Sequence, residues 1–463
     1  MRVPAPRPYQ VYGIHWLCGR KSAILADDTG LGKTLELVHA CRALKAKALV
    51  VCPKSLIQEW LDELRKWWPE AKIIVPESPN LYRRLLQYAA NADIKLVNYE
   101  RLLADIEALP RRAVLFDTLI LDEAQRVKND KTQTYDAIWT ILRHFEHRPS
   151  RVYLATATPV ENKPKDLVNL LQLIGFGLCD LTFERKPRMD IKHGRLVQYV
   201  NPAALKPGPE LLARLRRVVL RRRKEDVLPE LPPLQSIDRF LELGPSQREL
   251  YEQFLKDLVI VLDERTVEVR NVLAKVTYLR EVCDAAQLID RRRESSAKLQ
   301  ELRALTREIV DGGHKVVIFS EFRKMTTIIV RELRKLGMPV AYIHGAPCDV
   351  ATEKQRFAGE APVLVCTKAG EQGLNLQCAS YVINVEPVFN PARMKQREGR
   401  CHRGGQTERV TVYNLLAKDT YEERVCEILG AKRELFAGLV DALAVPKMDY
   451  VEWVRKVFLP EAG

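Results

Sequence analysis

The chain has 463 residues, of which 46% are hydrophobic and 29% charged, a balance that fits a soluble globular protein with two or three domains. Its formal net charge of +14 favours a polyanionic partner, nucleic acid before membrane, although solubility alone also explains a basic chain. The sequence has no apolar leader and no run of 18 apolar residues. We therefore expect a soluble intracellular protein of the cytoplasm or nucleoid, or of the nucleus in a eukaryote, with no membrane partner.

Two series of short β-branched runs alternate with longer helical patterns, which is typical of parallel α/β architecture. The first series predicts strands at residues 22–26, 48–52, 94–98, 118–121 and 151–155. The second predicts strands at residues 315–320, 340–344, 362–367, 381–385 and 410–415. Two such series predict two doubly wound parallel sheets.

A charged region with helical periodicity separates the two series, and its proline clusters mark element boundaries. We place the lobe boundary at Pro232-Pro233, which gives a first lobe of residues 1–233 and a second lobe of residues 234–463. Helical insertions are predicted at about 160–233 and at about 244–310.

The sharpest motif lies between the first predicted strand and a predicted helix. It reads Asp27-Asp28-Thr29-Gly30-Leu31-Gly32-Lys33-Thr34. Glycines let successive N–H groups face phosphate oxygens, and the helix N-terminus adds positive potential. Residues 28–34 are therefore predicted to bind ATP, with Lys33 at the β- and γ-phosphates and Thr34 as a Mg²⁺ ligand. The alternative is a glycine-rich turn before an ordinary helix.

An acidic pair follows the apolar run at residues 119–121. Asp122, at the strand end, is placed to hold Mg²⁺, and Glu123 to orient and deprotonate the attacking water. Alone, such a pair also fits a helix N-cap with first-turn charge. Its position about ninety residues after the lysine loop favours the catalytic interpretation.

Further motifs follow in order along nearly the whole chain. They are Pro8-Tyr9-Gln10, Pro53-Lys54-Ser55-Leu56, Thr156-Ala157-Thr158-Pro159, the basic run 220–227 with Leu231-Pro232-Pro233, residues 369–376, and residues 396–406. Together with the loop and the acidic pair they resemble the Swi/Snf-type DNA translocases of the second helicase superfamily. The resemblance implies two RecA-like lobes and the use of ATP and Mg²⁺. The basic run is especially diagnostic, and its alternative interpretation is a solvated basic face or a nuclear-import signal.

The resemblance also assigns roles to single residues of the first lobe. Gln10 is expected to read adenine, and the segment 156–159, with Asn162, to couple hydrolysis to lobe movement. Asp28 and Thr29 replace the family's glutamate and methionine but leave the phosphate-binding atoms in place. The expected nucleic-acid contacts in this lobe are Lys54, Ser55, Asn98 and Tyr99.

In the second lobe the resemblance implies a nucleotide contact at Gly373 and nucleic-acid contacts at Lys368 and Asn375. Arg400 and Arg403 are the candidate arginine fingers, which can supply roughly 10³–10⁵ in rate by stabilising transition-state charge. A patch that binds only the nucleic-acid backbone is the alternative for this basic cluster.

These motifs together predict an ATP-dependent translocase on double-stranded DNA, a monomeric motor whose targeting depends on protein partners or on DNA structure. The predicted catalytic residues are Lys33, Asp122, Glu123, Arg400 and Arg403. One rival is a strand-separating helicase on DNA or RNA, which the segment 220–233 argues against. The other is a non-catalytic nucleic-acid-binding scaffold, which the presence of all the catalytic residues argues against.

Overall fold

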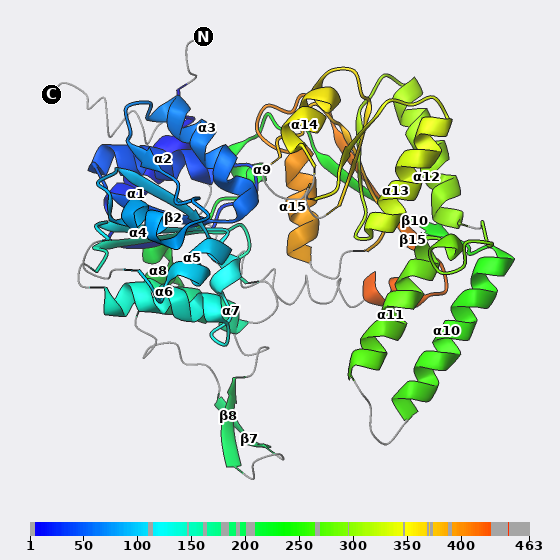
Figure 1. The fold of residues 1–463 in the computed structure, drawn as a ribbon, viewed down its shortest axis with the longest axis horizontal. Coiled ribbons are helices and arrows are strands. Elements are labelled where there is room, and N and C mark those ends of the chain that lie inside the picture. The colour runs from blue at the N-terminus through cyan, green and yellow to red at the C-terminus, as the bar shows by residue number, and fades with distance from the viewer. Residues whose placement is uncertain are drawn as a thin grey trace. The chain divides into compact units, whose positions relative to one another are not determined.

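The chain forms two units, one of Met1–Pro229 with Arg433–Gly463 and the other of Glu230–Lys432, each with its own parallel sheet (Figure 1). The structure is a computed structural model. It describes residues 5–109, 114–145, 148–160, 164–176, 185–190, 195–200, 209–263, 269–294, 296–345, 348–367, 370, 374–387, 391–426 and 443.

The first unit has a seven-stranded sheet in the order β3-β4-β2-β5-β6-β1-β9, and every paired neighbour is parallel. Its strands are β1 (Ser22–Leu25), β2 (Ala48–Cys52), β3 (Ile73–Ile74), β4 (Ile94–Asn98), β5 (Thr118–Asp122), β6 (Arg151–Ala155) and β9 (Val219–Leu220). The central strands are apolar on both faces because helices cover both. Ile24 of β1 packs in one core, whereas its neighbours Ala23 and Leu25 pack in another.

The helices of the first unit connect the parallel strands. They are α1 (Pro8–Cys18), α2 (Lys33–Leu44), α3 (Ile57–Trp67), α4 (Leu81–Ala89), α5 (Tyr99–Asp105), α6 (Gln133–His144), α7 (Pro164–Leu173), α8 (Pro209–Val218) and α9 (Lys224–Val227), with short 3-10 turns η1 (Lys54–Leu56) and η2 (Ala124–Val127). The charged region after β6 also contains an antiparallel pair, β7 (Arg185–Asp190) and β8 (Arg195–Val200), which the helical periodicity did not predict.

The second unit has a six-stranded parallel sheet in the order β10-β15-β14-β11-β13-β12. Its strands are β10 (Leu234–Leu241), β11 (Val316–Phe319), β12 (Val340–Ile343), β13 (Val363–Cys366), β14 (Tyr381–Asn384) and β15 (Val410–Ala417). Alternate residues of β11 again face two cores, with Val316 and Ile318 in one and Val317 and Phe319 in the other. The edge strand β10 was not predicted, because most of its side chains are partly or fully exposed and its apolar pattern is weak.

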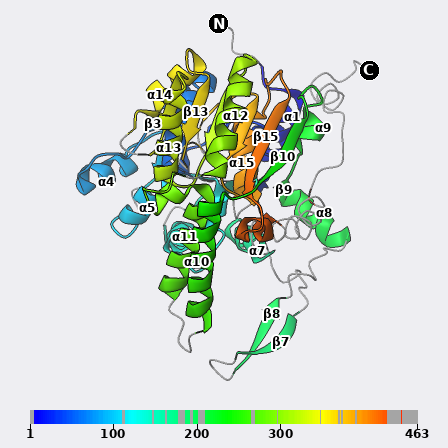
Figure 2. The ribbon, with the colours of Figure 1, turned by 90° about the vertical axis from the view of Figure 1, so that its right-hand side faces the viewer.

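The helices of the second unit flank this sheet, except for two that pack against each other and extend away from it (Figure 2). That pair is α10 (Pro245–Asp263) and α11 (Val269–Asp284). The others are α12 (Ala297–Asp311), α13 (Arg323–Lys335), α14 (Val350–Ala358) and α15 (Pro391–Cys401), with the short turn η5 (Ala286–Leu288).

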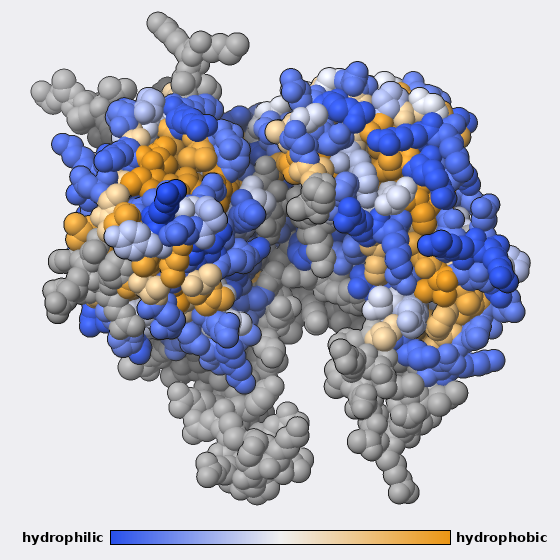
Figure 3. Space-filling model, viewed as in Figure 1, coloured by the Kyte–Doolittle hydropathy of each residue, from blue (hydrophilic) through white to orange (hydrophobic). Residues whose placement is uncertain are grey.

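The predicted fold class is confirmed, since two parallel sheets are each covered by helices. All ten predicted strands are present, with ends that differ by at most two residues. Among the described residues, the helices are all too short or too polar to cross a membrane. On the face of each unit in view, hydrophobic residues gather in patches that hydrophilic residues surround (Figure 3).

Candidate nucleotide site and the surrounding motifs

The predicted phosphate loop joins β1 to α2. Gly30 and Gly32 have φ angles of 80° and 85°, the left-handed region that glycine adopts without strain. Gly32 is the N-cap of α2 and has no side chain that could accept a hydrogen bond from the first turn of this helix. A Cβ atom at Gly32 would lie 2.5 Å from Gln10 Nε2. The loop therefore offers helix N–H groups to an anion, and a larger residue at position 32 would be strained by the positive φ and would displace the Gln10 amide.

Lys33 and Gln10 both bind the backbone of this loop. The Lys33 ammonium donates to the carbonyl oxygens of Asp27 and Asp28, at 2.9 and 3.1 Å. Gln10 Nε2 donates to the carbonyl of Leu31 at 3.1 Å, and Gln10 is buried in α1. The structure thus brings the predicted adenine-reading residue and the predicted phosphate lysine to one loop.

The acidic pair stands at the end of β5, at the edge of the sheet from which the loop also starts. Trp60 Nε1 and the backbone N–H of Glu123 donate to the two carboxylate oxygens of Asp122, at 2.8 and 2.9 Å. Burial and then the charge of Glu123 raise the pKa of Asp122 to about 7, against opposing effects that include the charge of Lys33. A buried carboxylate with this environment would be stabilised in its ionised form by a cation.

Glu123 adopts a left-handed conformation, with φ of 51°, which is uncommon for a residue other than glycine. Its carboxylate accepts a hydrogen bond of 2.6 Å from Gln125 Nε2, and Gln125 Oε1 accepts one of 2.8 Å from the Thr156 hydroxyl. A chain of two hydrogen bonds therefore joins the acidic pair to the first residue of the segment 156–159. Backbone strain of this kind is found preferentially at functional sites.

The residues expected to contact nucleic acid differ in exposure. Lys54 and Ser55 are exposed on η1, directly after β2, and Asn375 is exposed in the second unit. Asn98 is half-buried and caps α5 by accepting a hydrogen bond of 2.8 Å from the Arg101 N–H. Tyr99 is only 2% exposed and its hydroxyl donates to the carbonyl of Asp122 at 2.8 Å. The expectation for Tyr99 therefore needs correction, because its side chain lies in the core and supports the acidic pair.

The basic run 220–227 is not a solvated face. Arg221, Arg222 and Lys224 are 3%, 1% and 8% exposed, and Arg223 alone among its four basic residues is exposed. Burial on this scale excludes an accessible import signal formed by these side chains. Sequence reasoning gave no indication of their partners, which lie almost two hundred residues earlier at the phosphate loop.

In the second unit, Arg400 lies on α15, and Arg403 follows the end of that helix. Arg400 is buried and Arg403 is half-buried. Two other arginines of α15, Arg393 and Arg397, bind the carboxylate of Glu321 at 2.7 and 3.1 Å. Glu321 follows β11, so these contacts fasten the helix that carries the candidate fingers to the sheet of its own unit.

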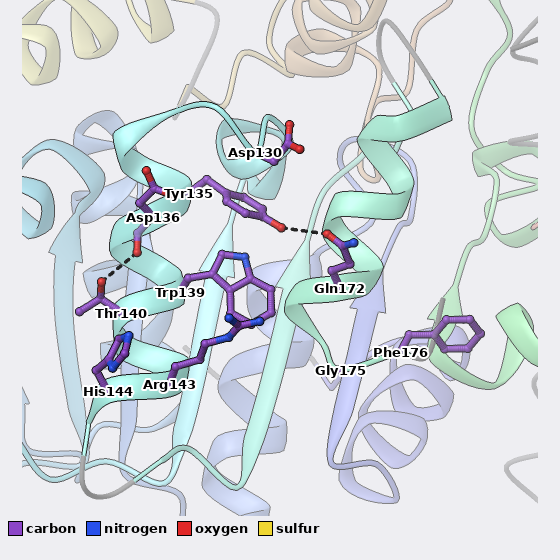
Figure 4. Close-up of a pocket in the computed structure, with 10 residues that line it drawn as sticks. All are labelled: Asp130, Tyr135, Asp136, Trp139, Thr140, Arg143, His144, Gln172, Gly175 and Phe176. Carbon is purple, nitrogen blue, oxygen red and sulfur yellow. Dashed lines mark hydrogen bonds between the residues drawn. The ribbon is translucent and has the colours of Figure 1, made fainter. Parts of the chain in front are cut away.

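Three expected positions lie outside the described residues, namely Asn162, Lys368 and Gly373. A surface pocket of about 760 Å³ lies elsewhere on the first unit, beside α6 and the end of α7 (Figure 4). Its lining includes Trp139, with the Arg143 guanidinium 4.0 Å from the ring centroid, and it contains none of the predicted catalytic residues.

The donor atoms of the first unit fit a magnesium nucleotide. The loop supplies N–H groups and an ammonium for phosphates, while the Thr34 hydroxyl and the Asp122 carboxylate are the oxygen donors that Mg²⁺ prefers. Within the described part of the chain no three His, Cys, Asp or Glu side chains form a metal-binding cluster.

The chain has a phosphate-binding loop, a buried aspartate beside it and two parallel α/β units. These features define the class of P-loop nucleoside triphosphatases with two lobes. Residues 9–288 match the SNF2-related domain, and residues 297–405 match the helicase conserved C-terminal domain. The first match covers more than half of the chain, which therefore belongs to the SNF2-related family. The resemblance seen in the motifs is confirmed, and membership in this family implies an enzyme that uses ATP.

Several known proteins are similar to the chain over nearly its whole length. An uncharacterized ATP-dependent helicase of Mycoplasma pneumoniae is 28% identical over 453 residues, covering 94% of this chain and 42% of that protein. The chromodomain-helicase-DNA-binding protein 1-like of Danio rerio is 29% identical, covering 94% and 44%. The Sulfolobus solfataricus SWI2/SNF2 ATPase core in complex with dsDNA is 26% identical, covers 99% of both chains and has a TM-score of 0.42. The chain spans less than half the length of these two curated relatives.

Proposed function

We propose that the chain is an ATP-dependent translocase that moves along double-stranded DNA. The observation that carries this proposal is the phosphate loop beside buried Asp122 in a chain of the SNF2-related family. Support for DNA as the track comes from the Danio rerio relative, whose name joins a helicase with DNA binding. The strongly basic composition is consistent with a polyanionic track.

In this proposal the first unit binds and positions the nucleotide. Lys33 would leave the loop carbonyls for the β- and γ-phosphates, and the helix N–H groups after Gly32 would bind phosphate oxygens. Thr34 and Asp122 would hold Mg²⁺, which neutralises phosphate charge when it is bound. Gln10 would contact the adenine.

Glu123 is the proposed general base, since its carboxylate can orient and deprotonate a water molecule. Its hydrogen-bonded link through Gln125 to Thr156 would report the state of that carboxylate to the segment 156–159. Arg400 and Arg403 of the second unit are the proposed arginine fingers, which would stabilise transition-state charge when the two units close on the nucleotide.

Lys54, Ser55 and Asn375 are the proposed contacts to DNA, because their side chains are exposed. Contacts to phosphates release counterions and carry no base information, so binding should weaken steeply with salt and show little sequence preference. Equal affinity at 50 and 200 mM salt, or strong preference for one sequence, would contradict this mode of binding.

The decisive test is the rate of ATP hydrolysis with no polynucleotide, single-stranded DNA, duplex DNA and duplex RNA. We expect the largest stimulation with duplex DNA, and loss of hydrolysis in Lys33→Ala under every condition. Stimulation by single strands or by RNA alone would favour the helicase alternative. Absence of hydrolysis under all four conditions would favour the scaffold.

Movement without strand separation is tested on two further substrates. One is a duplex with a third strand in its major groove, and the other is a forked duplex. Backbone contacts are indifferent to base pairing, whereas melting costs roughly 1.4 kcal/mol per base-pair step. We expect displacement of the third strand with the fork left intact.

A further inference from the structure

Residues 220–228, hereafter the strap, run beside the phosphate loop at the end of the first unit. β9 pairs in parallel with β1, with Leu220 opposite Leu25. The pairing continues beyond both strands, because the Asp28 N–H donates to the carbonyl of Arg222 at 3.1 Å. The strap thus follows the loop as an additional backbone partner, and the chain passes into the second unit just after it, between Pro229 and Glu230.

One guanidinium joins the three elements that surround the loop. Arg222 Nε donates to both carboxylate oxygens of Asp27 at 3.0 Å, and Arg222 Nη2 to both oxygens of Glu36 at 2.7 Å. Arg222 Nη1 donates to the carbonyl of Tyr9, the neighbour of Gln10. Asp27 starts the loop, Glu36 lies in the first turn of α2, and Tyr9 lies in α1. A planar guanidinium that binds all three resists sliding of any one past the others.

Asp28 is bound to the strap as closely as Asp27 is. Its carboxylate pairs with Arg221 Nη2 at 3.1 Å and accepts a hydrogen bond of 3.2 Å from the Lys224 N–H. Asp27 accepts a further hydrogen bond of 2.8 Å from the Arg222 N–H. The carboxylates of two consecutive loop residues, Asp27 and Asp28, therefore both bind the strap.

The same two residues are the partners of Lys33, whose ammonium donates to the carbonyls of Asp27 and Asp28. A bound phosphate competes for this ammonium because it offers a charged acceptor in place of two neutral ones. Transfer of Lys33 to phosphate frees both carbonyls at the residues whose carboxylates hold the strap. Buried, close-packed contacts change between discrete arrangements, so a local rearrangement there is passed on to the strap.

We propose that the strap is a nucleotide-responsive element, in which Arg222 acts as a positioning residue that transmits occupancy of the phosphate loop to the end of the first unit. This inference rests on the proposed function and deepens it. It gives the diagnostic basic run a role in coupling nucleotide binding to movement.

The first experiment measures hydrogen exchange in the unmodified chain, with and without Mg²⁺ and a non-hydrolysable ATP analogue. We expect exchange in residues 220–228 to change at least threefold, together with that in residues 27–34. The reference is residues 93–98, which include β4 near the far edge of the same sheet and should keep their exchange rates. Protection of the loop with no change in the strap would overturn the proposal.

The second experiment compares Arg222→Lys with Arg223→Lys. Lysine keeps the charge at position 222 but cannot bridge two carboxylates in a planar fork. Arg223 is exposed and pairs with Asp226 outside the loop, so it is the matched control. We expect Arg222→Lys to bind the analogue within threefold of the unmodified chain, to lose the strap response and to lower DNA-stimulated kcat at least tenfold.

The two proposals fail in different ways. Duplex-stimulated hydrolysis together with an unresponsive strap would refute the strap and leave the translocase intact. A responsive strap without hydrolysis on any polynucleotide would refute the translocase alone. If Arg222→Lys does not fold, the exchange experiment on the unmodified chain still decides the question. A folded Arg222→Lys with normal DNA-stimulated kcat would show that the arginine only stabilises the unit.

Discussion

Each unit contains a cluster in which a buried, positively charged side chain binds two buried carboxylates. The two clusters have different surroundings. In the first unit Arg222 binds Asp27 and Glu36 beside a loop that ends in a glycine N-cap, Gly32, at the start of α2. In the second unit the Lys298 ammonium binds Asp284 and Glu422 at 3.0 and 2.7 Å. All three side chains of the second cluster are fully buried.

The second cluster joins structural elements of its own unit. Lys298 lies in α12 and Asp284 ends α11. Glu422 also accepts a hydrogen bond of 2.7 Å from the Ala417 N–H at the end of β15. The comparison teaches that buried charge alone does not mark a site. The geometry of the neighbouring backbone does. The Arg222 cluster adjoins Gly30 and Gly32 in left-handed conformations and a helix that starts at a glycine, whereas the helix of Lys298 starts at Ser296, whose side chain caps it.

The substitution with the largest expected effect tests whether the second unit takes part in ATP hydrolysis or only supports the fold. We expect Arg403→Ala to lower DNA-stimulated kcat by roughly 10³–10⁵, because a finger stabilises charge that develops only in the transition state. The KM for ATP should stay within about threefold of the unmodified value. Steady-state kinetics with saturating duplex DNA provide the measurement, and Arg409→Ala, an exposed arginine nearby, is the control. Parallel losses in kcat and affinity would remove the finger assignment.

A somewhat smaller effect is expected in the first unit for Glu123→Gln. The amide cannot accept the proton of the attacking water, so we expect kcat to fall by roughly 10²–10⁴ while ATP still binds. Equilibrium binding and single-turnover hydrolysis separate the two steps. Glu100→Gln, which alters an exposed partner of Arg126, is the matched control. Hydrolysis near the unmodified rate in Glu123→Gln would show that another group serves as the base.

Breaking the Lys298 cluster should affect stability and not nucleotide chemistry. Lys298→Met leaves Asp284 and Glu422 buried without their cation, which we expect to cost about 3–5 kcal/mol. Thermal or denaturant unfolding measures this loss, and Lys335→Met at an exposed ion pair should change stability by less than about 1 kcal/mol. Nucleotide affinity of the folded Lys298→Met chain should remain unchanged. A loss of affinity without a loss of stability would erase the distinction between the two clusters.

The sequence predicted those features that depend on neighbouring residues. Apolar β-branched runs predicted the long central strands, and the glycine pattern before Lys33 predicted a loop between a strand and a helix, in which Gly30 and Gly32 adopt left-handed conformations. The two-residue strands β3 and β9 are too short to show a pattern. The exposed strand β10 lacks a clear alternation of apolar residues.

Contacts between distant residues could not be predicted in the same way. Arg222 lies 195 positions after Asp27. A run of basic residues is equally typical of a solvated face. Tyr99 followed a predicted strand and was expected at the surface, yet its hydroxyl reaches the carbonyl of Asp122, 23 positions later. Burial of a polar side chain depends on partners that only the folded chain brings close.

The smallest expected effect concerns Trp60, four residues after Leu56 of the predicted segment 53–56. The structure buries Trp60 in α3 and directs its Nε1–H to Asp122 Oδ2. A neutral donor that orients a metal-binding carboxylate typically changes metal affinity about tenfold when it is removed. Trp60→Phe keeps most of the ring volume, so we expect the Mg²⁺ concentration for half-maximal hydrolysis to rise about tenfold at an unchanged maximal rate.

Trp67→Phe is the matched control for this prediction, because it lies on the same helix and its Nε1 donates to Glu63, one turn earlier. Both substitutions remove one indole donor from α3 and should lower stability by similar amounts, about 1 kcal/mol. Only Trp60→Phe should shift the Mg²⁺ dependence, since only Trp60 contacts Asp122. Equal Mg²⁺ curves for the two variants would mean that the indole supports the fold without orienting the carboxylate. Asp122 would then be held by its own backbone and the Glu123 N–H alone.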